Sequence, residues 1–138
     1  MRKKFYSIIL GLLILHSYRI FGSENNDLII GSWIFQSMST TYYSDPAEKE
    51  IIKKDNDHNE ILIFSEDGTF NYKGKTDGDL DQGVGLWIIN EEKLTTVVDN
   101  EKTISEYSII EGVLTITTNE IETEEYFATK SIIVYQKQ

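Results

Sequence analysis

The stretch from Glu60 to Leu94 decides the fold, and it reads EILIFSEDGTFNYKGKTDGDLDQGVGLWIINEEKL. Runs of β-branched and aromatic residues alternate in it with short clusters of Gly, Asp and Asn. Such runs are typical of β-strands, and the residues between them are those that tight turns prefer. Gly68 marks the clearest turn, because it supplies the positive φ angle that such a hairpin needs. The stretch therefore predicts four consecutive antiparallel strands.

The same alternation continues on both sides of this stretch. The expected strands are residues 28–38, 59–65, 69–75, 83–90, 93–98, 103–110, 113–118 and 123–136. Short turns between most of them favour a meander, in which each strand pairs with the next. Eight strands can close into a barrel that has no exposed edge. We expect an all-β protein with an eight-stranded antiparallel up-and-down barrel; a sandwich of two sheets is the alternative.

The long connection between the first two strands has features of a short helix. Asp45 is a good N-cap, Pro46 suits the first helical position, and Glu48 follows three residues after the cap. Lys54 at the other end would complement the helix dipole. We expect one short helix within residues 45–54, which would be either a lid over an open barrel end or a cap that plugs it.

Residues 1–23 have the layout of a secretory signal peptide. A basic start at residues 2–4 precedes an apolar run at residues 5–15, which is too short to span a bilayer. We expect cleavage after Ser23, an exported protein (periplasmic, cell-envelope or secreted) and one domain over residues 24–138. An uncleaved N-terminal anchor is the alternative.

Composition limits the partners and the cross-links. The chain contains no Cys, which excludes a lipid-modified N-terminal Cys, disulfide bonds and Cys-based metal sites. Its formal net charge is −10, and an acidic surface repels nucleic acid and anionic lipid. We expect neither of these as a partner.

Several motifs, taken in order, resemble bacterial secreted lipocalin-like domains. Gly31, Ser32 and Trp33 match the Gly-x-Trp signature of the first lipocalin strand. Residues 64–70 resemble the Phe-x-x-Asp-Gly-Thr-Phe hairpin of those domains. The resemblance covers about residues 28–136 and implies a barrel rather than a particular activity. Its structural signature would be Gly31, Trp33, Asp67 and Gly68.

One position departs from the lipocalin pattern. Lipocalins commonly pack an Arg from near the chain end across the first-strand Trp. Residues 24–138 contain no Arg, so the resemblance implies that Lys130 or Lys137 takes this place against Trp33.

Aromatic residues at inward-facing positions are the candidate ligand-binding residues. Aromatic walls with a few hydroxyl groups are typical of pockets for small apolar molecules, yet the same rings would equally fill a closed core. Both interpretations are open at this point. The candidates are Phe35, Phe64, Phe70, Tyr72, Trp87, Tyr107 and Tyr126.

The sequence offers little for catalysis or metal binding. Residues 24–138 hold a single His, His58, and no Gly-x-Ser-x-Gly elbow, so we expect no enzyme. Residues 77–83 place Asp at the first, third and fifth positions of a calcium-type loop. However, Gln82 and Ile88 stand where the turn Gly and the closing Glu belong. We expect an acidic hairpin loop there, and neither a metal site nor a cofactor.

These observations predict an exported protein that binds a small apolar or amphipathic molecule in the barrel. The alternative is a non-enzymatic structural or protein-interaction module with a filled barrel core and a Tyr-rich patch around Tyr42 and Tyr43. The sequence identifies neither the ligand nor a protein partner.

Overall fold

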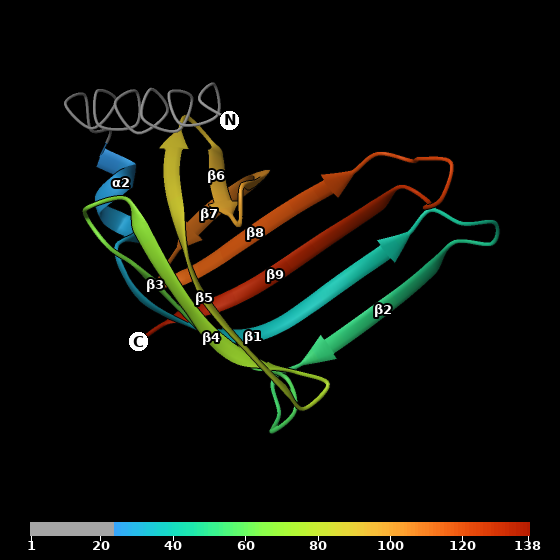
Figure 1. Cartoon of the computed structure of the whole chain (residues 1–138), viewed down its shortest axis with the longest axis horizontal. Helices are drawn as coiled ribbons and strands as arrows, with labels where there is room; N and C mark the ends of the chain where they lie inside the picture. The colour runs from blue at the N-terminus through green and yellow to red at the C-terminus, as the bar shows by residue number, and fades with distance from the viewer. Residues whose placement is uncertain (1–23) are drawn as a thin grey trace, which may run out of the picture.

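Nine strands and one short helix make up residues 24–138, which are the residues that the computed structural model describes (Figure 1). The expected signal peptide, residues 1–23, lies outside the described residues. The elements are α2 (Glu24–Ile29), β1 (Gly31–Tyr42), β2 (Glu48–Lys53), β3 (Asn59–Phe64), β4 (Thr69–Thr76), β5 (Asp79–Asn90), β6 (Lys93–Val98), β7 (Glu101–Ile110), β8 (Val113–Glu120) and β9 (Thr129–Lys137).

Eight of these strands close into an antiparallel barrel. Each strand from β3 to β9 pairs with the next, and β1 pairs with β3 along one edge and with β9 along the other. Gly68 and Gly112 have φ angles of 85° and 76°, as expected for the glycines of the β3–β4 and β7–β8 turns. The predicted eight-stranded antiparallel barrel is therefore confirmed.

The helix predicted within residues 45–54 is wrong, because this segment contains strand β2. β2 pairs with the second half of β1, from Ser37 opposite Lys53 to Tyr42 opposite Glu48. The free edge of β1 gives these residues backbone hydrogen-bond partners, whereas an isolated helix this short is only marginally stable in water. Successive strand side chains point to opposite faces. Ile52 accordingly packs against the core, and Ile51 is 59% exposed.

Strand β2 and parts of three barrel strands form a twisted sheet, which we call the arm. It consists of residues 37–42 of β1, all of β2, residues 115–120 of β8 and residues 129–134 of β9. Figure 1 shows the arm extending away from the barrel, at an angle to the tip of the β4–β5 hairpin. The barrel therefore has a closed end, near α2, and a splayed end between the arm and that hairpin. We call the splayed end the mouth.

Two differences from the expected strands change which side chains point inward. The pairing of β1 with β9 shifts between Phe35 and Ser37, so Gln36 is an extra residue and Met38 lies on the inner face. The last strand begins at Thr129 rather than near residue 123, and the buried Tyr135 lies on its inner face. The first strand begins at Gly31 rather than at residue 28, because Leu28 lies in α2.

The closed end of the barrel is filled with side chains. Trp33, Phe64, Leu94 and Leu114 are fully buried, and Ile29 of α2 covers them. The Trp33 indole N–H donates to the Ile29 carbonyl oxygen at 2.6 Å. The short helix α2 thus closes this end of the barrel and provides a hydrogen-bond acceptor for the indole N–H of the buried Trp33.

Lys137 places its ammonium group over the ring of Trp33. Its Nζ lies 5.2 Å from the centroid of the Trp33 ring and donates to the Leu28 carbonyl oxygen at 3.1 Å. A cation over a Trp face is attracted by the ring quadrupole. Of the two lysines that the sequence suggested, Lys137 makes this contact.

Candidate functional site

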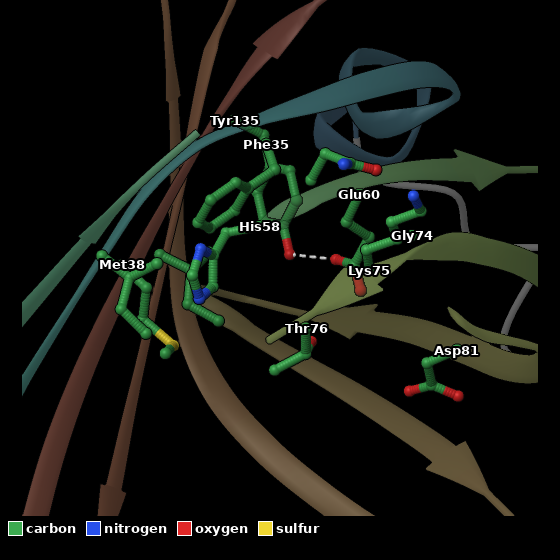
Figure 2. A pocket seen from close by; sticks show the side chains of 12 residues that line it. Phe35, Met38, His58, Glu60, Gly74, Lys75, Thr76, Asp81 and Tyr135 are labelled. Carbon is green, nitrogen blue, oxygen red and sulfur yellow. Dashed lines mark hydrogen bonds between the residues drawn. The ribbon is translucent and has the colours of Figure 1, made fainter. Parts of the chain in front are cut away.

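A cavity of about 120 Å³ opens at the mouth of the barrel (Figure 2). Its two walls differ in chemistry. One wall, from the arm and the neighbouring part of the barrel, is apolar and includes Phe35, Met38, Ile52 and Ile133. The opposite wall comes from β3, β4 and β5 and is polar; it includes Glu60, Thr76 and Asp81. The cavity is therefore amphipathic and reaches solvent at the splayed end.

Glu60 and Tyr135 join the two walls. The Tyr135 hydroxyl donates to Glu60 Oε1 at 2.6 Å across the barrel, as Figure 2 shows. Tyr135 is only 4% exposed, and its ring packs edge-on against Phe35 with centroids 6.1 Å apart. Burial, together with the Glu60 charge, raises the pKa of Tyr135 well above its ordinary value, so the hydroxyl stays a donor.

The Glu60 carboxyl is partly removed from water. Burial raises the pKa of Glu60, the hydrogen bond from Tyr135 opposes this shift, and the charge of Asp81 adds to it. Glu60 and Asp81 also act on Tyr72. Desolvation raises the pKa of Tyr72, and the charges of Asp81, Asp99 and Glu60 raise it further. The lining of the cavity includes two carboxylates, Glu60 and Asp81, together with the ammonium group of Lys75.

His58 fastens two loops at the rim of the cavity. Its Nε2 lies 3.0 Å from Asp77 Oδ1 in the β4–β5 turn, and its Nδ1 lies 3.0 Å from Asp55 Oδ1 in the β2–β3 loop. Hydrogen bonds with Asp77 and Asp55 raise the pKa of His58. The Gly78 N–H also donates to the Asp57 carbonyl oxygen at 3.0 Å. The sequence placed His58 in a polar loop but gave no sign of this bridge.

Backbone hydrogen bonds hold the Asp55 side chain in place beside His58. Asp55 Oδ1 accepts the backbone N–H groups of Asp57 and His58 at 2.8 and 2.7 Å. These two bonds, with that to the His58 ring, lower the pKa of Asp55. The first Asp of the calcium-like loop, Asp77, is the residue that contacts His58 Nε2. Within residues 24–138, no group of three or more His, Asp or Glu side chains is placed to hold a metal ion.

The inner face of the arm continues the cavity outward and becomes more polar. Beyond Met38 and Ile133, the Thr40 and Ser131 hydroxyls lie 3.2 Å apart, and those of Ser105 and Thr118 lie 2.7 Å apart. Thr40 and Ser105 are buried. We call these four hydroxyl groups, three from the arm and that of Ser105 from β7, the hydroxyl band.

The seven candidate aromatic residues separate into three groups. Phe35 lines the cavity. The other six do not line it: Phe64, Phe70 and Trp87 are buried in the filled core, and Tyr72 and Tyr107 are half-buried against that core. Tyr126, expected on the inner face of the last strand, lies in the β8–β9 loop and is 72% exposed.

One of the expected signature residues, Asp67, orders the β3–β4 turn. Its Oδ1 accepts the Thr69 N–H at 2.9 Å and the Thr69 hydroxyl at 2.6 Å. Next to that turn, the indole N–H of Trp87, one of the ligand-binding candidates, donates to the Ser65 carbonyl oxygen at 3.0 Å. Together with Gly31 and Trp33, these residues build the barrel rather than the cavity.

Comparisons with known proteins give no relative. No protein-family model matches the chain, and a search of curated proteins finds no match. None of the helices in the described part of the chain is both long and apolar enough to cross a membrane. The functional argument therefore rests on the cavity and its surroundings.

Proposed function

We propose that this protein is an exported lipocalin-like binding protein that holds a small apolar or amphipathic molecule at the mouth of its barrel. The observation that carries the proposal is the solvent-open cavity with an apolar wall facing a polar one. Pockets for small molecules combine apolar surface with a few placed polar groups in this way. The lipocalin-like assignment is supported by the barrel topology and the Gly31 and Trp33 motif. Export is supported by the character of residues 1–23.

The filled closed end limits the size of the ligand. Small-molecule pockets commonly measure about 300–1,000 Å³, and this cavity is about 120 Å³. A long acyl chain therefore does not fit inside the barrel. The proposed ligand is a compact molecule, or one that inserts a short end and lies along the arm with the remainder. No catalytic step is assigned to the site.

Two neighbouring isoleucines on β2 provide a matched test. Ile52→Trp fills the cavity, whereas Ile51→Trp places the same ring on the outer face. We expect the neutral fluorescent probe N-phenyl-1-naphthylamine to bind the wild type and the Ile51→Trp variant and to be blocked in the Ile52→Trp variant. Equal binding by both variants, or no binding by the wild type, would contradict the proposal. Native mass spectrometry of protein purified without detergent would then search for a ligand that co-purifies.

A second candidate function is protein docking through the end of the arm. The Tyr43 N–H donates to the Ala128 carbonyl oxygen at 3.0 Å, which brings the β1–β2 and β8–β9 loops together. Exposed apolar side chains gather on these loops, and we call them the arm tip: Tyr42, Tyr43, Ile121, Tyr126 and Phe127. Exposed aromatic groups of this kind mark interaction sites.

Charge indicates which partner the arm tip would fit. The β8–β9 loop carries Glu122, Glu124 and Glu125 beside the apolar side chains. The complementary partner is a protein surface that is both basic and apolar. Capture of such a protein should be lost in a Tyr43→Ser, Phe127→Ser double variant and should weaken as the salt concentration rises. Capture should persist in the control variant Ile104→Ser, which alters exposed apolar surface on β7. Capture that tolerates the double variant would exclude this role.

A further inference from the structure

The polar wall of the cavity contains a carboxylate, that of Glu60, that forms no ion pair with a cation of residues 24–138. None of the ion pairs formed within residues 24–138 includes Glu60. Lys75 lies at the same cavity but makes no ion pair with Glu60 or with Asp81 in the described part of the chain. Among the described residues, the Glu60 side chain has a hydrogen-bond partner in the neutral hydroxyl of Tyr135. One hydrogen bond leaves a partly buried carboxylate with acceptor positions to spare.

The other charges around the cavity do not neutralise Glu60. Asp81 lies on the same wall and adds negative charge. His58, when protonated, is already shared between Asp55 and Asp77. An anionic ligand would therefore meet like charge, and a neutral apolar ligand would remove water from Glu60 without replacing it.

A cation with a short apolar body matches both walls. We propose that the cavity selects ligands with an ammonium or guanidinium group, which binds Glu60, and an alkyl or aryl body, which packs on Phe35, Met38 and Ile133. Hydrogen bonds between a cation and a carboxylate are short and strong when water is partly excluded. This inference rests on the proposed function and names the ligand class of that same site.

The cavity volume favours a small cationic ligand. A volume of about 120 Å³ equals the liquid volume of about four water molecules. An ammonium group with a short hydrocarbon body fits, with any remainder projecting toward the hydroxyl band of the arm. Because Tyr135 occupies only Oε1 of Glu60, the cation can bind the carboxylate without breaking the existing hydrogen bond.

Three ligands of similar shape and different charge test this inference: benzylamine, benzyl alcohol and benzoate. Binding is followed by NMR through the methyl groups of Met38, Ile52 and Ile133, which line the cavity. We expect benzylamine to bind about tenfold or more tightly than benzyl alcohol, as one hydrogen bond to a charged group implies. Benzoate should bind most weakly.

Two charge-neutralising variants separate Glu60 from the general acidity of the protein. Glu60→Gln keeps the shape and an oxygen acceptor for Tyr135, and should cost about tenfold in benzylamine affinity and little in benzyl alcohol affinity. Glu92→Gln changes net charge equally in the exposed β5–β6 turn and should leave both affinities unchanged. If Glu60→Gln does not fold, the Glu60 carboxyl ¹³C shift in the wild type supplies the test. Benzylamine should then lower the midpoint of its titration.

The outcomes distinguish the inference from the proposed function. Equal affinity for the amine and the alcohol would overturn the cation preference and leave the binding function in place. Amine binding that survives Glu60→Gln, or an unchanged Glu60 titration, would assign the attraction to net charge and overturn the role of Glu60. If none of the three ligands nor N-phenyl-1-naphthylamine moves the cavity methyl signals, both proposals fail.

Discussion

The Tyr135→Phe substitution removes one hydroxyl from the point where the two walls of the mouth meet. In the wild type this hydroxyl donates to Glu60 Oε1 at 2.6 Å, and Tyr135 is 4% exposed. A hydrogen bond to a charged group contributes about 1.5–3 kcal/mol, and an unsatisfied buried acceptor costs a similar amount. Because the ring and its packing on Phe35 are retained, we expect a loss of about 1.5–3 kcal/mol in the free energy of unfolding at pH 8.

The loss of stability caused by Tyr135→Phe should become smaller as the pH falls. Burial raises the pKa of Glu60 in the folded protein, so the folded state binds a proton more readily than the unfolded state. Below that pKa the carboxyl is neutral, and the hydrogen bond from Tyr135 falls to about 0.5–1.5 kcal/mol, as for neutral pairs. The effect of Tyr135→Phe should therefore shrink as the pH falls through the Glu60 titration. It should be smallest below the ordinary Glu pKa.

Urea unfolding followed by the emission of Trp33 and Trp87 at pH 8 and pH 4 measures this difference. Tyr126→Phe is the matched control, because it removes the same hydroxyl from a residue that is 72% exposed, and should change stability by less than about 0.5 kcal/mol. A Tyr135→Phe loss that is equal at both pH values would refute the charged hydrogen bond. A loss no larger than that of Tyr126→Phe would refute the coupling of the two walls.

Three further predictions test the core, the rim and a close approach between strands. Leu114→Ala opens a cavity at a fully buried site and should lower the free energy of unfolding by about 2–5 kcal/mol in urea titrations. His58→Asn removes a side chain whose pKa in the folded protein is raised mainly by the hydrogen bond with Asp77. The stability that His58 supplies is complete below its unfolded pKa and is lost as the pH rises through the raised folded pKa. Thermal melts should therefore show a larger loss of stability for His58→Asn at pH 5.5 than at pH 9. Gly85→Ala would place a Cβ against the Phe70 ring and 2.7 Å from a backbone oxygen, and should lower stability by about 1–3 kcal/mol in the same urea assay.

The strand pattern and the turn glycines predicted the barrel because both are local. Alternation between Glu60 and Tyr72, with Gly68 between, indicates a hairpin whatever the remainder of the chain does. For residues 45–54 two local signals competed. Asp45 and Pro46 have helix preferences, but residues 48–53 instead pair as a strand with the second half of β1, which directly precedes them. Tertiary pairing commonly overrides propensity in so short a segment.

The register of β9 was not accessible to the same reasoning. Val134 and Tyr135 alternate across a strand whose start at Thr129 depends on where the β8–β9 loop ends. A shift of one residue exchanges the two faces of the strand. The same applies to β1, where the extra residue Gln36 exchanges the faces between Phe35 and Met38. Most of the apolar wall of the mouth comes from these two strands, which explains why the predicted wall and the observed wall share few residues.

Glu60 was nevertheless visible in the sequence. It has the same parity as Leu62 and Phe64 in β3, so a strand that buries these two side chains must point Glu60 inward as well. A charged residue on the inner face of a barrel strand is costly unless it has a partner or a function. The partner, Tyr135, lies 75 positions away and could not be assigned without the register of β9. The sequence therefore contained the anomaly that marks the site, whereas the three-dimensional structure was needed to identify Tyr135 as the donor of a hydrogen bond to Glu60.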